Sequence, residues 1–281
     1  MTLLYFSASD GARLAYRDEG EGLPLLALAG LTRDGTDFDY LANDLRDARL
    51  IRLDSRGRGG SEWTGADTYT VAQEAQDALA LLDHLGIQRA AVIGSSRGGL
   101  LAMVMVAMQP ARVAGICFND VGPELERSGL ERIGAYVGVP PAVQTLEEVA
   151  DRMPAAMKGF ADVPAMRWAE EAVRHYIERP DGLKLPYDPE LRRSFEEAMA
   201  APAVDLWPLY EACAGMPLAL VRGANSDVLS AVTARRMADL CPHLRVANVP
   251  GRGHIPFLDE PEARTTIEAW LADVKRREAF G

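Results

Sequence analysis

Short apolar runs alternate along the chain with longer segments in which apolar residues recur every three to four positions. The runs at 24–30, 48–54, 89–95 and 113–120 are mainly apolar and are bounded by turn residues. Continuous apolar strands imply burial on both faces of a sheet. Between these runs lie helical patterns, of which the segment 69–86 is the clearest example. This alternation predicts a parallel sheet with helices on both sides.

The pattern differs at the beginning and in the middle of the chain. Residues 3–8 and 12–18 alternate like strands around Ser-Asp-Gly, which predicts an antiparallel hairpin at the edge of the sheet. From 123 to 206 the segments are helical and rich in Met, and no buried strand is indicated. Strand patterns resume at 216–227 and 244–254, and a helix closes the chain at 261–280. We therefore expect a core domain in two parts, 1–122 and 207–281, with a helical insertion at 123–206.

Composition and charge narrow the range of functions. With 281 residues, 48% of them hydrophobic, the chain can bury the core of one large domain. The net charge of −11 is spread along the chain and no basic run occurs, which disfavours nucleic acid or a membrane surface as a partner. The N-terminus resembles neither a signal peptide nor an anchor, so we expect a soluble cytoplasmic protein.

No feature of the sequence indicates a cofactor or a metal. Cys117, Cys213 and Cys241 are widely separated and form no CxxC pair, which argues against both a disulfide framework and a zinc site. The loop 54–61 is rich in Gly but lacks GxGxxG spacing and any GK[ST], so it does not indicate nucleotide binding. The expected partner is a small-molecule substrate, and a homodimer is left open.

One short motif carries a specific chemistry. Gly94-Ser95-Ser96-Arg97-Gly98 follows a predicted strand and opens a predicted helix, which is the setting of a GxSxG nucleophile elbow with Ser96 at its centre. Glycines are needed in such a turn because side chains there would clash. The alternative is that Ser96 only caps a helix, since GxSxG also occurs by chance.

A base and an acid follow Ser96 in the order that a Ser-acid-His triad requires. Asp227 lies just past one predicted strand and His254 just past the next. His254 would take the proton from Ser96, and Asp227 would hold the imidazole in its useful tautomer. Asp227 is preferred because its loop directly precedes the strand that leads to His254. Asp120, at the end of an earlier strand, is the alternative acid, and we expect it to organise the entry to the insertion instead.

The other aspartate and histidine residues that could serve as acid or base have simpler interpretations. Asp54 also ends a predicted strand, but it is not preferred as the acid. His84 lies in an amphipathic helical segment, His175 in the insertion and His243 before a strand, and each is expected to serve in packing or at the surface.

These motifs together resemble the α/β-hydrolase superfamily, and within it the cap-bearing ester and carbon-carbon bond hydrolases. The resemblance covers nearly the whole chain, and its blocks are LALAGLTRDGTDF, IRLDSRGRGGSEW, GSSRGG, LVRGANSDVLS and VPGRGHIPFLDEPE. It implies an α/β fold with a mostly parallel central sheet, helices on both faces and a helical cap. It also implies an oxyanion hole made by the backbone N–H groups of Leu31 and Arg97. Relatives usually carry His where this chain has Ala29.

The substrate class is narrowed by the nucleophile and by the insertion. A serine at the elbow points to acyl transfer, whereas an aspartate would have pointed to epoxide or haloalkane opening. We expect the insertion to cover the site as a lid, with an apolar pocket. The candidates for its lining are Met153, Met157, Met166, Trp168, Met199 and Trp207, each of which could instead pack the cap onto the core. Arg33 and Arg97 could bind a substrate carboxylate, but salt bridges within the protein are preferred for both.

Three functions remain open from the sequence. The leading one is a serine hydrolase that cleaves a small, largely apolar carboxylic ester or lactone through an acyl-enzyme. The alternative is a carbon-carbon bond hydrolase of meta-cleavage diketones or an acyltransferase, because pocket shape and not fold decides among these. The third is a non-catalytic, hydrolase-like receptor, against which the complete set of Ser, acid and His argues.

Overall fold

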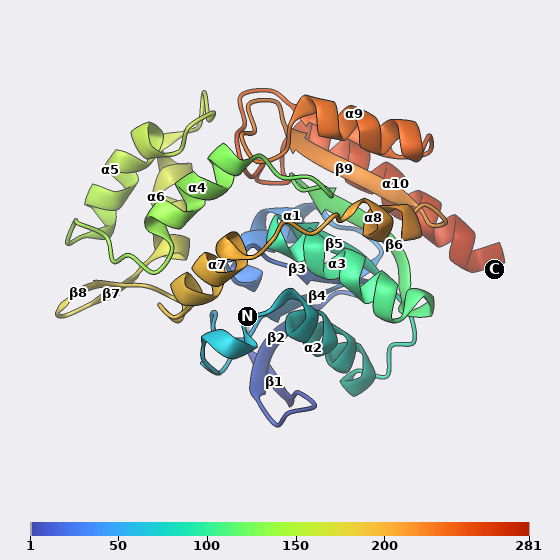
Figure 1. Cartoon of the computed structure of the whole chain (residues 1–281), viewed down its shortest axis with the longest axis horizontal. Helices are drawn as coiled ribbons and strands as arrows, with labels where there is room; N and C mark the ends of the chain where they lie inside the picture. The colour runs from blue at the N-terminus through green and yellow to red at the C-terminus, as the bar shows by residue number, and fades with distance from the viewer. Residues whose placement is uncertain (1, 281) are drawn as a thin grey trace.

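The computed structural model describes residues 2–280, with only the backbone of Phe280, and its centre is one mixed sheet (Figure 1). Within this range the sheet has eight strands in the order β1-β2-β4-β3-β5-β6-β9-β10. These are β1 (Leu4–Ser7), β2 (Arg13–Glu19), β3 (Leu23–Leu28), β4 (Ala48–Asp54), β5 (Ala90–Ser95), β6 (Val113–Asn119), β9 (Leu218–Gly223) and β10 (Arg245–Val249). The β1–β2 and β2–β4 pairs are antiparallel and the other neighbours are parallel, which confirms the predicted edge hairpin and parallel centre.

Helices cover both faces of the sheet, as the pattern predicts. On β3, Leu26 and Leu28 pack in the same core as the helices α2, α3, α8 and α9, whereas Leu25 and Ala27 face α1 and α10. This division follows from the alternation of side chains along a strand. The helices are α1 (Asp39–Asp44), α2 (Val71–His84), α3 (Arg97–Met108), α8 (Trp207–Ala212), α9 (Ala231–Leu240) and α10 (Pro261–Phe280), with short 3₁₀ turns η1 (Gly35–Phe38), η2 (Ala66–Thr68) and η3 (Pro110–Arg112).

Most of the chain between β6 and α8 forms the insertion, which lies to the left of the sheet in Figure 1. Its helices are α4 (Arg127–Tyr136), α5 (Leu146–Ala156), α6 (Ala165–His175) and α7 (Leu191–Ala200). Thr145 and Glu148 form a capping box that starts α5. The predicted helical insertion is therefore confirmed, while its boundaries at 123 and 206 stay a prediction.

A two-stranded hairpin inside the insertion was not expected from the sequence. It pairs β7 (Ile177–Arg179) with β8 (Gly182–Lys184). Each strand has three residues and most of them are accessible, so neither an apolar run nor a clear alternation marks them. The hairpin connects α6 to α7.

Candidate active site

Ser96 lies at the turn between β5 and α3, and its backbone is in the left-handed region with φ +50°. That region is unfavourable for a residue with a side chain, so the surroundings must hold the turn in place. The flanking glycines allow the turn to close. A Cβ at Gly94 would collide with the backbone of Gly98, and a Cβ at Gly98 would collide with the carbonyl of Leu28. The strand, turn and helix of the predicted elbow are all present.

Ser96, His254 and Asp120 form one hydrogen-bonded chain. The Oγ of Ser96 lies 2.9 Å from Nε2 of His254, and Nδ1 of His254 lies 2.8 Å from Oδ2 of Asp120. Asp120 is fully buried, and the His254 side chain is 8% exposed. Three segments far apart in the sequence therefore meet at the carboxyl ends of β5, β6 and β10.

The carboxylate of Asp120 is held by further donors. The backbone N–H of Gly223 donates to its Oδ1 at 2.9 Å, and the Ser226 hydroxyl donates to its Oδ2 at 2.6 Å. An ionised carboxylate only accepts hydrogen bonds, so Nδ1 of His254 is the donor in the contact with Asp120. The lone pair of the neutral imidazole is then on Nε2, which faces the Ser96 hydroxyl and can accept its proton.

The prediction that Asp227 contacts His254 is wrong, because Asp120 occupies that position. Asp227 is 33% exposed and forms an ion pair with Arg132 of α4. The reason is local: Ser226 of the same loop turns its hydroxyl toward Asp120, while the next side chain points to the insertion. Asp120, for which the sequence predicts a role at the entry to the insertion, instead lies against His254. Its sequence signal was its position at the end of the run 113–120.

The two backbone groups predicted to form an oxyanion hole lie beside Ser96. Leu31 lines the same cavity as Ser96, and Arg97 is the first residue of α3, where N–H groups have no partner within the helix. The Gly30 carbonyl, which shares a peptide group with the Leu31 N–H, accepts a hydrogen bond from the Arg33 N–H at 3.2 Å, and this bond helps to orient that peptide. The role of these two N–H groups stays a prediction.

Glu74 forms ion pairs with two arginines beside the predicted oxyanion hole. This α2 carboxylate is fully buried and forms ion pairs with Arg58 at 3.0 Å and with Arg97 at 2.8 Å. Burial alone would raise the pKa of Glu74, but the two guanidinium groups outweigh it and lower the pKa below its usual value. The Arg97 side chain is thereby engaged within the protein, in agreement with the preferred interpretation.

The cavity above Ser96 has a volume of about 390 Å³ and lies between the core and the insertion. Arg33, Met153 and Met157 line it, and their role in binding a substrate stays a prediction. Trp168 and Trp207 are not among the described residues that line it, so their prediction as pocket residues is corrected. Trp168 packs against the rings of Phe160 and Phe257, and Trp207 packs in the core below α3. Burial of a large aromatic side chain explains both positions.

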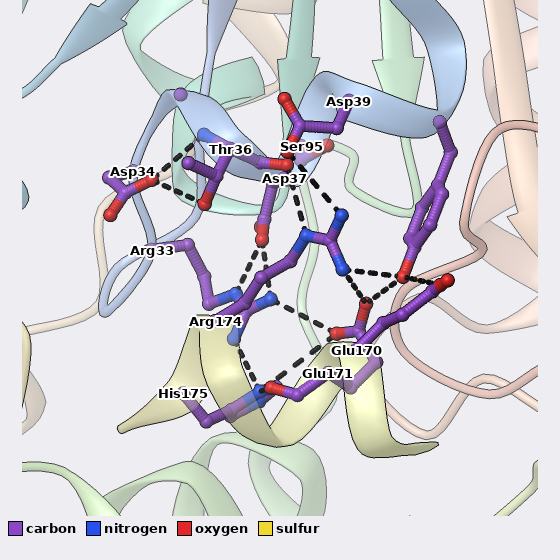
Figure 2. A network of polar contacts seen from close by, with 12 residues as sticks. Arg33, Asp34, Thr36, Asp37, Asp39, Ser95, Glu170, Glu171, Arg174 and His175 are labelled. Carbon is purple, nitrogen blue, oxygen red and sulfur yellow. Dashed lines mark hydrogen bonds and ion pairs between the residues drawn. The ribbon is translucent and has the colours of Figure 1, made fainter. Parts of the chain in front are cut away.

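Arg33 belongs to a polar network on the wall of this cavity (Figure 2). Its guanidinium forms ion pairs with Asp37 at 2.5 Å and with Glu171 at 3.1 Å. Its Nη1 also lies 2.6 Å from Nδ1 of His175, at the end of α6. Burial raises the pKa of Asp37 to about 6. The preferred interpretation of Arg33, a salt bridge, agrees with these contacts.

His175 and Ser226 are residues of this site that the sequence interpretation missed. The sequence predicts that His175 serves in packing or at the surface, whereas the structure places it at the cavity that contains Ser96. Its position in the insertion follows no motif, and only the amphipathic pattern of α6 indicated which of its residues face inward.

The remaining expectations concern metals, membranes and assembly. Among the described residues no group of three or more His, Cys, Asp or Glu side chains could hold a metal ion. No helix among residues 2–280 is both long and apolar enough to cross a membrane. The predicted cytoplasmic location and the homodimer that the sequence left open stay predictions.

A family model described as the alpha/beta hydrolase family matches residues 25–266, which is most of the chain. The chain belongs to the alpha/beta hydrolase family. It is a hydrolase of this family and has its fold, as the sequence resemblance predicted.

Three similar proteins each match most of the chain. A 3-hydroxybutyrate-oligomer hydrolase from Cupriavidus necator is 37% identical over 262 residues, which is 89% of each chain. The crystal structure of an alpha/beta hydrolase from Novosphingobium aromaticivorans has a TM-score of 0.90 and 39% identity, and the match covers 97% of this chain and 98% of that one. A 2-(acetamidomethylene)succinate hydrolase from Mesorhizobium japonicum is 28% identical over 263 residues, 91% of this chain and 89% of its own.

Proposed function

We propose that this hydrolase cleaves small, largely apolar carboxylic esters or lactones through an acyl-enzyme on Ser96. The observation that carries the proposal is the chain of two hydrogen bonds from Ser96 through His254 to Asp120, at 2.9 and 2.8 Å. A hydroxyl, a base and an orienting acid at these distances form the arrangement that activates a serine nucleophile.

Each group has a defined role in the proposed reaction. As Oγ of Ser96 attacks the ester carbonyl carbon, Nε2 of His254 takes its proton, and Asp120 stabilises the imidazolium that forms. The N–H groups of Leu31 and Arg97 donate to the developing oxyanion, worth about 3 kcal/mol each in comparable sites. His254 then returns the proton to the leaving alcohol. A water molecule, activated by the same base, releases the acid and restores Ser96.

The cavity and the curated relatives support the substrate class. Apolar side chains such as Met153, Met157 and Phe160 make up much of the lining, and a cavity of about 390 Å³ suits a small acyl ester. The relative from Cupriavidus necator is a 3-hydroxybutyrate-oligomer hydrolase. We therefore include esters of hydroxy acids in the proposed class.

The experiment is labelling by a fluorophosphonate probe together with hydrolysis of p-nitrophenyl acetate and butyrate. The wild type should be labelled and active, and Ser96→Ala should lose both properties. The matched control is Ser95→Ala, because the buried Ser95 hydroxyl accepts a hydrogen bond from Asn119 and should not react. Retained labelling of Ser96→Ala would contradict the proposal. A labelled enzyme that cleaves ring-cleavage diketones but no ester or lactone would favour the carbon-carbon bond hydrolase, and an unlabelled protein would favour the receptor.

A further inference from the structure

The wall of the cavity formed by α6 and the loop after β3 holds charged side chains that already compensate one another (Figure 2). Arg33 faces both Asp37 and Glu171, and their side chains are between 7% and 11% exposed. Arg174 lies beside Glu171 and Asp39. Because each cation has carboxylate partners, this wall is a poor receptor for a second carboxylate.

Arg33 determines which nitrogen of His175 carries the proton. A guanidinium only donates hydrogen bonds, so the contact of 2.6 Å with Nδ1 requires a lone pair on Nδ1. Nδ1 also lies 2.8 Å from the Glu171 carbonyl, but a proton placed there would lie against the cation. Burial and the charge of Arg33 lower the pKa of His175 well below its usual value, so the imidazole is neutral. Its proton is then on Nε2.

The Nε2–H of His175 is a donor without an acceptor in the part of the chain that the structure describes. Among the described residues no hydrogen-bond partner of this nitrogen is found, although the side chain is only 26% exposed and lines the cavity of Ser96. Apolar side chains, including Val143 and Met157, line the same cavity. A polar group in such surroundings gains from an acceptor on a ligand, and rejects a ligand that leaves it unpaired.

We propose that Nε2–H of His175 donates a hydrogen bond to a second, uncharged oxygen of the substrate, separate from the ester that Ser96 attacks. The substrate class is then esters of hydroxy acids or of their O-acylated forms, in preference to simple alkanoate esters of equal length. This inference rests on the proposed function and assigns its specificity. Arg33 acts as a positioning residue, since it fixes the tautomer of His175 without reaching the substrate oxygen.

The test compares kcat/KM for ethyl 3-hydroxybutyrate and ethyl butyrate. The wild type should prefer the hydroxy ester at least tenfold, and His175→Phe, which removes the donor and keeps a planar ring, should bring the ratio close to one. A tenfold change corresponds to about 1.4 kcal/mol, the range of one hydrogen bond in a partly dry site. The control is His84→Phe on α2, which packs against Phe6 and Tyr16 and should leave the ratio unchanged.

A third substrate tests the direction of the hydrogen bond without any mutation. Ethyl 3-methoxybutyrate has an oxygen that accepts but cannot donate, so the wild type should still prefer it over ethyl butyrate. Loss of preference for the methoxy ester, or an unchanged ratio in a folded His175→Phe, would overturn the inference while leaving ester hydrolysis intact. A wild type that cleaves none of the three esters and takes up no fluorophosphonate would instead overturn the proposed function.

Discussion

The hydroxyl of Ser226 donates a hydrogen bond of 2.6 Å to Oδ2 of Asp120, the same oxygen that lies 2.8 Å from His254. The loop after β9 therefore contributes to the site through a serine and not through the neighbouring Asp227. The Ser226 hydroxyl also accepts from the backbone N–H groups of Val228 and Leu229, so it joins the buried carboxylate to the turn of this loop.

Ser226→Ala is expected to lower kcat for p-nitrophenyl butyrate about tenfold with little change in KM. The loss of one hydrogen bond to a charged group is worth about 1.5 kcal/mol or more, and here it loosens the carboxylate that orients His254. Ser226→Thr, which keeps the hydroxyl, is the matched variant and should retain most of the activity. Equal losses in both variants would show that the loop, and not the hydrogen bond, matters.

Gly98→Ala is expected to destabilise the protein by at least about 1 to 3 kcal/mol and to abolish fluorophosphonate labelling. The added Cβ would collide with the Leu28 carbonyl, so β3, the elbow or both must shift. The measurement is the midpoint of urea unfolding, together with labelling. Gly215→Ala is the control, since a Cβ at Gly215 meets no heavy atom within 4 Å. A Gly98→Ala protein with normal stability and labelling would contradict this account of the elbow.

Glu74→Gln is expected to cost about 3 to 5 kcal/mol at neutral pH, because it leaves the buried Arg58 and the partly buried Arg97 without their carboxylate. The pKa of Glu74 is lower in the folded than in the unfolded state. The stability that Glu74 supplies is therefore fully present above its pKa of about 4.5 in the unfolded chain, and it is lost as the pH falls through its pKa in the folded protein.

Unfolding by urea between pH 3 and pH 7 measures this contribution. The wild type should lose stability as the pH falls through the acidic part of that range, and Glu74→Gln should lose less of it. Parallel curves for the two proteins would show that Glu74 does not carry the pH dependence.

Much of the fold could be predicted from the sequence because its signals are local. The buried strands, the elbow glycines around Ser96 and the position of His254 after a strand are each visible within a few residues. The information that decides which carboxylate pairs with His254 is not local. Asp120 and Asp227 both follow strands, and only the packing of β6 between β5 and β9 decides which carboxylate reaches His254.

The sequence of the insertion does not distinguish residues that line the cavity from residues that pack the helices. Its aromatic and sulfur-containing side chains serve both to pack the helices and to line the cavity, and the sequence pattern is the same for the two roles. Met153 and Met157 line the cavity, whereas Trp168 lies behind Phe160 and Phe257. The role of His175 depends on Arg33, which is 142 positions away in the sequence.

The most direct test of the account compares kcat/KM for Asp120→Asn and Asp227→Asn on p-nitrophenyl butyrate. Asp120→Asn should lower it by about 10⁴-fold, because the amide no longer holds His254 in the productive tautomer. Asp227→Asn should change it by no more than about fivefold, since the partly exposed pair with Arg132 is worth roughly 1 kcal/mol or less. A severe loss in Asp227→Asn with a nearly normal Asp120→Asn would contradict the central claim that Asp120 is the acid of this site.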